Sequence, residues 1–263
     1  MTTQPTIPEE TRALKKRLFD ESFQWLSKTV PRPISRKWVV LEAGQGRYGW
    51  SDLYHDHFDR VYGADIEDYS AYHPGVTSIK TDFCDHIPLP EQSIDLIVSH
   101  SVLEHVGDVA AALRNFDRVL KTGGFVFITI SPLYYSAEGS HIRRPVKYEN
   151  WEHLDPTNPA YLCNDPCPDA VTDGHGLNKM TLSDFLAAIG RQPWSIMQLK
   201  VKIDPRPLPD HLTQLRWREN DLRTKGFFLL AHKEWHCQDF CELNSTSQME
   251  NNPPPVQPYT SAS

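Results

Sequence analysis

The strongest constraint on the fold is the stretch Val39–Gly49, which reads VVLEAGQGRYG. Its first part is β-branched and apolar and ends in the acid Glu42, so it predicts a buried parallel strand. The turn that follows contains Gly44 and Gly46, and glycine permits both a tight turn and the close approach of a ligand to the backbone. Because ligands of open α/β sheets bind at the carboxyl ends of strands, this turn is the first candidate for a binding site.

A second short strand, residues 60–65, ends in Asp65, which follows Gly46 by 19 residues (65 − 46). This spacing suits an acid that accepts hydrogen bonds from a ribose at the end of the neighbouring strand. Further strands are expected at residues 76–79, 94–99, 123–130, 195–201 and 226–231. Helical segments alternate with most of these strands, which predicts a mainly parallel sheet with right-handed crossovers.

Three helical segments have recognisable signals. The spacing of Leu14, Leu18, Trp25 and Leu26 predicts a helix from Glu9 to a point before Pro31. A crossover helix is expected at residues 50–58. Asp108 is a good N-cap for the next helix, whose predicted buried stripe consists of Val109, Ala112, Leu113, Phe116 and Leu120. Thr181 and Asp184 predict the start of a short helix that ends at Gly190.

Residues 131–180 interrupt this alternation, because they are rich in Pro, Asn, Asp and His and show little periodicity. A long irregular segment inside a compact domain is usually either functional or disordered. Its aromatic side chains argue against disorder; they are Tyr134, Tyr135, Tyr148, Trp151 and Tyr161. We therefore expect a substrate-binding insertion within a domain at 9–242, between disordered ends at 1–8 and 243–263.

Composition narrows the class of protein. The chain has 263 residues, a net charge of −7 and a pI of about 5.9, so nothing indicates general attraction to nucleic acid or to an anionic membrane. No apolar run approaches the roughly 20 residues that span a bilayer, and residues 1–10 lack the apolar core of a signal peptide. Five cysteines, an odd number, do not indicate a disulfide framework, and we expect a reducing, cytoplasmic setting.

Taken together, residues 38–131 resemble the class I S-adenosylmethionine-dependent methyltransferases, especially the small-molecule group called type 11. The resemblance rests on the glycine turn, on Asp65, on Thr81-Asp82-Phe83, and on the runs 93–105 and 123–130. It implies a doubly wound, Rossmann-like, seven-stranded and mainly parallel α/β sheet, closed by two last strands of which one is antiparallel. The implied cofactor is S-adenosylmethionine, and the implied partner is a small-molecule methyl acceptor.

The resemblance also implies roles for single residues around the cofactor. Glu42, Gly44 and Gly46 border its methionine part, and Asp65 accepts hydrogen bonds from the ribose hydroxyls. The adenine contacts fall to Ile66, Asp82 and the backbone of Phe83, and the backbone of His100 faces the reacting methyl group. Each residue also has a purely structural interpretation: Asp65 as a solvated strand end, Asp82 as a turn residue, and the helix at residue 9 as a cover for either the cofactor pocket or the sheet edge. Glu104 and His105 are interpreted as structural.

Methyl transfer needs little from the protein beyond alignment of the nucleophile and exclusion of water, because the sulfonium already activates the methyl group. An oxygen nucleophile also needs a base, and His141 is the first candidate, with His153 and His175 as alternatives. The alternative interpretation of His141 is a residue that holds its loop by hydrogen bonds. The acidic-aromatic tetrapeptide of amino-group DNA methylation is missing after residue 99, which disfavours nucleic acid as the acceptor.

Two other functions stay open. Gly44, Gly46 and Gly49 match the G-x-G-x-x-G pattern of a nicotinamide-dependent oxidoreductase, although the chain contains no Tyr-x-x-x-Lys. Ala43 and Gln45 depart from the usual methyltransferase turn, which leaves room for a protein that binds the cofactor without catalysis.

Four of the five cysteines form two C-x₃-C pairs, Cys163 with Cys167 and Cys237 with Cys241. Four thiolates are able to hold a structural zinc ion. The usual spacing is C-x₂-C, so we expect reduced thiols and no metal.

Overall fold

The computed structural model describes residues 8–139, 150–157, 176–213 and 217–234. The secondary structure described below falls within one unit that ends at Lys233. The predictions for the two chain ends, for His141 and His175, and for both C-x₃-C pairs fall outside the described residues.

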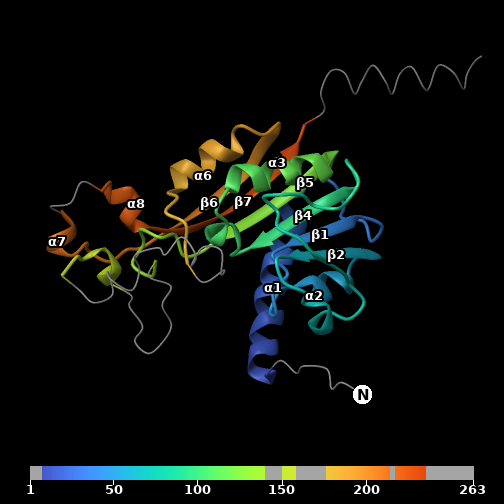
Figure 1. Ribbon diagram of the computed structural model, residues 1–263, viewed down its shortest axis with the longest axis horizontal. Coiled ribbons are helices and arrows are strands. Elements are labelled where there is room, and N and C mark those ends of the chain that lie inside the picture. Colours follow the sequence, from blue (N-terminus) through green and yellow to red (C-terminus); the bar gives the residue numbers. More distant parts are fainter. Residues whose placement is uncertain (1–7, 140–149, 158–175, 214–216, 235–263) are drawn as a thin grey trace, which may run out of the picture. The chain divides into compact units, whose positions relative to one another are not determined.

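Seven strands form one sheet in the order β3–β2–β1–β4–β5–β7–β6 (Figure 1). Pairing is parallel from β3 through β5, whereas β7 is antiparallel to both β5 and β6. The predicted mainly parallel, doubly wound sheet is thereby confirmed. The strands are β1 (Val39–Ala43), β2 (Arg60–Asp65), β3 (Thr77–Lys80), β4 (Ile94–His100), β5 (Leu120–Ile130), β6 (Trp194–Ile203) and β7 (Thr224–Lys233).

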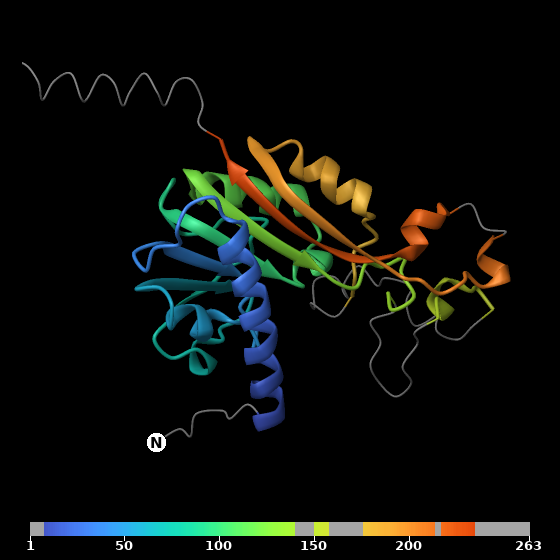
Figure 2. The same ribbon diagram turned by 180° about the vertical axis from the view of Figure 1, so that it is seen from behind.

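Helices cover both faces of the sheet. Figures 1 and 2 show α3 and α6 on one face and α1 on the other. The helices are α1 (Glu9–Thr29), α2 (Ser51–His55), α3 (Val109–Val119), α6 (Leu182–Ile189), α7 (Asp210–Thr213) and α8 (Glu219–Arg223). Single 3₁₀ turns lie at η1 (Ser70–Tyr72), η2 (Leu103–His105) and η3 (Glu152–Leu154). The first crossover helix, α2, is shorter than predicted.

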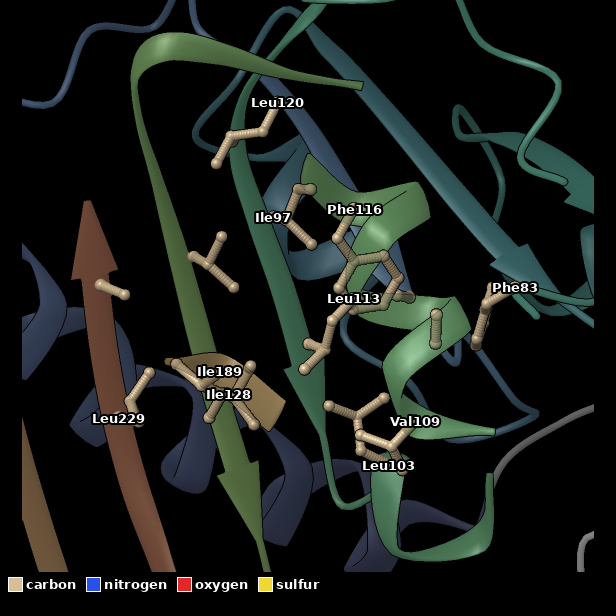
Figure 3. Packing of buried hydrophobic residues seen from close by; sticks show 14 of the residues in the cluster. Phe83, Ile97, Leu103, Val109, Leu113, Phe116, Leu120, Ile128, Ile189 and Leu229 are labelled. Atoms are coloured by element: carbon tan, nitrogen blue, oxygen red, sulfur yellow. The ribbon is translucent and has the colours of Figure 1, made fainter. Parts of the chain in front are cut away.

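The α3 face follows the sequence pattern closely. The Asp108 carboxylate accepts a hydrogen bond from Ala111 N at 2.9 Å and caps α3 as expected. The predicted capping box of Thr181 and Asp184 begins α6. All five residues of the predicted stripe are buried, and they pack on β4, β5 and β7 (Figure 3). The stripe ends at Leu120, which already belongs to β5, so this strand begins three residues earlier than expected (123 − 120).

The α1 face differs from its prediction by one helical position. Leu14 and Leu18 remain 48% and 41% exposed, and the residues that turn inward are Lys15, Phe19 and Leu26. The Phe19 ring meets the Tyr54 ring edge-on at 4.9 Å between centroids. Lys15 turns inward because its ammonium reaches Asp52 on α2 at 2.7 Å. A buried lysine, paired with a partly exposed aspartate, thus takes a position that apolar periodicity assigns to leucine.

A third hydrophobic cluster, here called the cap, forms beyond the carboxyl end of β5. Two insertions build it, one after β5 and one between β6 and β7, with α7 and α8 in the second (Figure 1). Its buried members are Tyr134, Ala137, Trp151, Leu154, Leu177, Leu212 and Leu222. The sequence indicated only the first insertion, because residues 204–223 have neither a strong helical period nor a long apolar run.

Polar contacts join the two insertions of the cap. The Trp151 indole donates to Leu222 O at 2.9 Å in a buried position. Arg206 forms an ion pair with buried Asp204, and its Nη1 donates to Asn150 Oδ1 at 2.9 Å. The Arg206 guanidinium also lies over the Trp151 ring, 5.3 Å from its centroid, which is within the roughly 6 Å over which a cation is attracted to an aromatic face. The hydrogen bonds from Arg206 hold the pKa of Asp204 at about 2.

Trp151→Phe tests whether the hydrogen bond from the Trp151 indole to Leu222 O holds the two insertions of the cap together. The variant leaves a buried carbonyl without its donor, which costs about 1–3 kcal/mol. We expect faster amide hydrogen exchange in residues 204–212 and 217–223, with β4 unchanged, measured by mass spectrometry. Trp217→Phe, at a partly buried position of the same cluster, is the control. Equal exchange in the parent and Trp151→Phe would show that apolar packing alone holds the insertions together.

Candidate active site

The glycine turn after β1 is shaped by close packing on one side and open space on the other. Gly44 and Gly46 have φ values of +88° and +48°. A Cβ on Gly44 would lie 2.0 Å from Val102 Cγ2, and a Cβ on Gly49 would lie 1.7 Å from Gln45 O. By contrast, a Cβ on Gly46 would meet nothing nearer than 3.9 Å. Gly46 therefore marks the point where a ligand can reach the backbone of the turn.

Glu42, at the end of β1, is almost fully buried and anchors the start of α2. Its two oxygens accept from Trp50 N at 2.7 and 3.0 Å, and Oε2 also contacts Ser51 Oγ. Burial raises the pKa of Glu42 to about 7, against the opposing effect of these hydrogen bonds. The sequence resemblance assigned Glu42 to the cofactor ammonium; the structure adds a task, because the same carboxylate holds the crossover helix in place.

Asp65 ends β2 next to the glycine turn, as the spacing predicted. Its Oδ2 accepts from Gly46 N at 2.9 Å, and its Oδ1 lies 3.4 Å from Glu67 N. A carboxylate offers about four acceptor positions, so acceptor capacity remains for a ligand hydroxyl beside these backbone contacts. Burial raises the pKa of Asp65 and exceeds the effect of the backbone hydrogen bonds.

A chain of polar contacts, which the sequence analysis missed, connects α1 to the turn. Lys15 Nζ lies 2.7 Å from Asp52 Oδ1, and His73 Nδ1 lies 3.3 Å from the same oxygen. His73 Nε2 then donates to Gly46 O at 2.8 Å. Burial raises the pKa of Asp52, but the hydrogen bonds from His73 and Lys15 outweigh it and bring the pKa to about 2. Gly46 is thus held at both N and O, by Asp65 and His73.

The three predicted adenine contacts have different surroundings. Ile66 is 41% exposed directly after Asp65, which leaves its side chain available to a ligand. Asp82 is exposed and accepts from Cys84 N at 2.8 Å, so it does shape a turn. The Phe83 ring is buried against Phe116, with 5.9 Å between ring centroids. Only the backbone of Phe83 is suited to a ligand contact, as the resemblance implied, and its carbonyl already accepts from Asn115.

The His100 side chain, at the end of β4, points to the α1 face. Its Nε2 lies 2.9 Å from the Tyr54 hydroxyl and its Nδ1 lies 3.4 Å from Thr129 Oγ1. The Trp50 ring lies against the imidazole with 4.0 Å between centroids. Burial lowers the pKa of His100 to about 3, so the ring is neutral near pH 7.

Of the three histidines considered as bases, the structure describes only His153, and it is a structural residue. It is fully buried in the cap and its Nε2 donates to Tyr134 O at 2.7 Å. Burial lowers the pKa of His153 to about 4. Full burial and the hydrogen bond to Tyr134 O argue against His153 as the base.

Glu104 and His105 are also structural, as interpreted from the sequence. The Glu104 carboxylate is buried and its Oε1 accepts from Ser131 N at 3.1 Å, just before the cis peptide Ser131–Pro132. His105 Nδ1 donates to Gly176 O at 2.7 Å. Asn178 Nδ2 donates to Leu103 O and Val106 O, each at 2.8 Å. The described segment at residue 176 is thereby fixed to η2 beside the carboxyl end of β4.

Glu104→Gln should change how stability depends on pH. Burial raises the pKa of Glu104 to about 7 from 4.5, so the folded state binds this proton more tightly than the unfolded state. The resulting stabilisation is present below pH 4.5 and is lost as the pH rises through about 7. The free energy of unfolding of the parent should decline between about pH 4.5 and 8, and this decline should be about 3 kcal/mol smaller in Glu104→Gln. Urea denaturation at each pH measures both.

The control for this experiment is Glu91→Gln, at an exposed glutamate. It should follow the pH dependence of the parent. A parallel decline of Glu104→Gln and the parent would show that Glu104 is ionised in the folded state across this range.

Comparison with known proteins agrees with this geometry. Residues 41–128 match the model of a family described as "Methyltransferase domain". A probable S-adenosylmethionine-dependent methyltransferase of Mycolicibacterium smegmatis is 35% identical over 97 residues, which cover 35% of this chain and 37% of that protein. The malonyl-[acyl-carrier protein] O-methyltransferase of Yersinia pestis is 32% identical over 95 residues, covering 35% and 36%. The resemblance to class I S-adenosylmethionine-dependent methyltransferases is confirmed. The matched region spans little more than a third of the curated relatives.

Solved structures support the fold over a longer stretch. An S-adenosylmethionine-dependent methyltransferase from Mesorhizobium loti superposes with a TM-score of 0.54 at 22% identity, covering 80% of this chain and 97% of that one. A geranyl diphosphate C-methyltransferase from Streptomyces coelicolor, crystallised with S-adenosyl-L-homocysteine, gives 0.54 at 14% identity, covering 82% and 78%. These likenesses establish a methyltransferase-like fold. Within the described part of the chain, no helix meets the length and apolarity of a membrane span, and no cluster of side chains suits a metal ion.

Proposed function

We propose that the protein binds S-adenosylmethionine at the glycine turn and transfers its methyl group to a small-molecule acceptor. The observation that carries the proposal is the clamped backbone at Gly46, which lies between Asp65 and the open side of the turn. A ligand placed there meets a carboxylate suited to ribose hydroxyls and a free backbone surface. The match of residues 41–128 to a methyltransferase family supports the same assignment.

The roles of the remaining residues follow from their surroundings. Ile66 would pack on the adenine face, because its side chain is exposed beside Asp65. Asp82 would accept from the exocyclic amine with the oxygen that Cys84 N leaves free. The backbone of His100 would face the methyl group, while Tyr54 and Thr129 hold its neutral imidazole on the α1 face.

The cap is the proposed boundary of the acceptor site. Its Tyr134 and Tyr135 follow β5 at the carboxyl edge of the sheet, with 5.1 Å between their rings. Aromatic side chains at this edge would exclude water from the reacting end of the acceptor. An oxygen nucleophile on that acceptor would need a base, for which His141 remains the proposal. The Yersinia pestis relative is named as an O-methyltransferase and the Streptomyces coelicolor neighbour as a C-methyltransferase, so both reaction types occur among similar proteins.

A nicotinamide-dependent oxidoreductase fits the sheet less well. The dinucleotide-binding fold has an all-parallel sheet with strand order 3-2-1-4-5-6. Here an antiparallel β7 lies between β5 and β6. A cofactor-binding protein without catalysis remains the second candidate. The feature that favours this second candidate is Gln45, which departs from the usual methyltransferase turn. Its side chain fills the space above Gly63, and its Nε2 is buried without a hydrogen-bond partner among the described residues.

Asp65→Ala tests the cofactor site. The variant removes an acceptor for the ribose hydroxyls and should weaken binding of S-adenosyl-L-homocysteine by about 1.5–3 kcal/mol, measured by calorimetry. Asp68→Ala, at an exposed acid on the same loop, is the matched control and should bind as the parent does. Identical affinities of Asp65→Ala and the parent would refute the ribose assignment.

Catalysis itself is tested by incubating the protein with methyl-labelled S-adenosylmethionine and a panel of small hydroxy, amino and carbon acids. Transfer of label to an acceptor, reduced about 10²–10⁴-fold in His141→Ala while cofactor affinity is kept, is the expected result for a base. Binding of S-adenosyl-L-homocysteine without transfer to any acceptor class would favour the non-catalytic candidate. A protein stabilised by NADH alone would favour the oxidoreductase.

A further inference from the structure

A groove lies on the α1 face of the sheet, between α1 and the strands β5, β7 and β6. Its volume is about 270 Å³, and it is lined by Glu21, Ser22, Trp25, Phe127, Lys200 and Phe228. The Trp25 and Phe127 rings lie 5.2 Å apart between centroids. Figure 2 shows the reason for the groove: α1 crosses this face of the sheet, and the β6–β7 hairpin extends beyond it without a helix on that side. The floor and one wall of the groove are therefore aromatic.

The groove is connected to the proposed reaction centre by the strand register. His100 pairs with Thr129, Thr129 with Phe228, and Phe228 with Lys200. These residues form one row across β4, β5, β7 and β6, and directly paired residues project to the same face of a sheet. Neighbouring strands lie about 4.8 Å apart, so Lys200 is about 14 Å from His100 along the row.

Lys200 ends this row and Lys202, which pairs with Gly226, follows two positions later on β6; neither has a carboxylate within ion-pair distance among the described residues. Lys200 and Lys202 are two positions apart on β6 and so project to the same face. Lys202 Nζ lies 4.4 Å from the centre of the Phe228 ring, and no described acid lies within ion-pair distance of either lysine. Burial lowers the pKa of Lys202, the neighbouring charges of Lys225 and Lys200 lower it further, and the Glu138 carboxylate, which pairs with Lys225, opposes this effect. Positive charges are thus crowded beside an aromatic groove.

Apolar surface continues from the groove along α1. Leu14, Leu18 and Trp25 share one side of the helix, because four and seven residues correspond to about one and two turns. The exposed Leu14 and Leu18 lie in the half of α1 that contains Lys15, which contacts α2 at the carboxyl edge of the sheet. This position explains why two leucines of the predicted stripe face outward: they extend the apolar wall toward the proposed site.

We propose that the groove binds the methyl acceptor, and that the acceptor has an apolar or aromatic body with an anionic headgroup, a carboxylate or a phosphate. The body lies over Trp25, Phe127 and Phe228, and the headgroup binds Lys200 and Lys202. The reacting atom then lies near His100, about three strand spacings from the anion. This inference rests on the proposed function and names its substrate class. Glu21 on α1 forms part of the opposite wall and opposes the anion.

The test uses probes that share one body and differ in the headgroup. Phenylbutyrate, phenylbutyl phosphate and phenylbutanol are titrated into the full chain, with affinities measured by calorimetry or ligand-observed NMR. We expect both anions to bind about tenfold more tightly than the alcohol, a difference of about 1.4 kcal/mol. Raising the salt concentration should weaken the anions and leave the alcohol nearly unchanged.

Variants assign the effect to the groove. Lys200→Met and Lys202→Met keep an unbranched side chain, one heavy atom shorter, and remove its charge. Each should reduce anion affinity several-fold and leave the alcohol unchanged. Lys28→Met, at an exposed lysine near the end of α1, is the matched control. Glu21→Gln should strengthen anion binding. Equal binding of anions and alcohol by the parent, or undiminished anion binding by both lysine variants, would overturn the proposal.

S-adenosyl-L-homocysteine binding is measured on the same samples, which separates this inference from the proposed function. The lysine variants should bind it as the parent does, because neither lysine lies near the glycine turn in the sheet order. If the parent binds S-adenosyl-L-homocysteine but shows no charge preference among the probes, the acceptor class is wrong and the cofactor assignment stands. If the probes behave as expected but S-adenosyl-L-homocysteine does not bind, the proposed function fails while the anion site is supported.

Discussion

The backbone of Gly46 is held on both sides, and the rest of the candidate site depends on this restraint. Asp65 accepts from its N–H, and His73 donates to its carbonyl. Through His73 and Asp52 the restraint reaches Lys15 on α1. One peptide unit thus joins β2, the first crossover and the N-terminal helix. A ligand that binds at the open side of Gly46 meets a surface already fixed in shape, so little conformational entropy is lost on binding.

Sequence reasoning was most successful where local chemistry decides the structure. The apolar strands, the Asp108 cap and the buried α3 stripe follow from residue spacing and from the hydrogen-bonding needs of a helix end, and the structure has them. The position of Asp65 beside Gly46 also followed from spacing, because parallel strands bring their carboxyl ends to one edge.

The failures share a different physical cause: contacts between residues far apart in the chain. Lys15 turns inward only because Asp52 lies opposite it, and no periodicity of α1 contains that information. Likewise, Leu212 and Leu222 resemble isolated apolar residues until Trp151 and Leu154 are placed against them. The task of Glu42 at the start of α2 was missed for a related reason, because the family pattern assigns that carboxylate to a ligand and hides its contacts with the protein.

The distance along the chain between the two insertions of the cap has a consequence for biosynthesis. Trp151 and the carbonyl that it contacts are 71 residues apart. The glycine turn, its acids and β1 to β5 are complete by residue 130, whereas the cap lacks its second half until the residues around Leu222 have been synthesised. A chain that emerges from the ribosome in order therefore acquires the residues of the proposed cofactor site well before it acquires both halves of the cap. A truncation upstream of β7 would retain the first group of residues and lose the second.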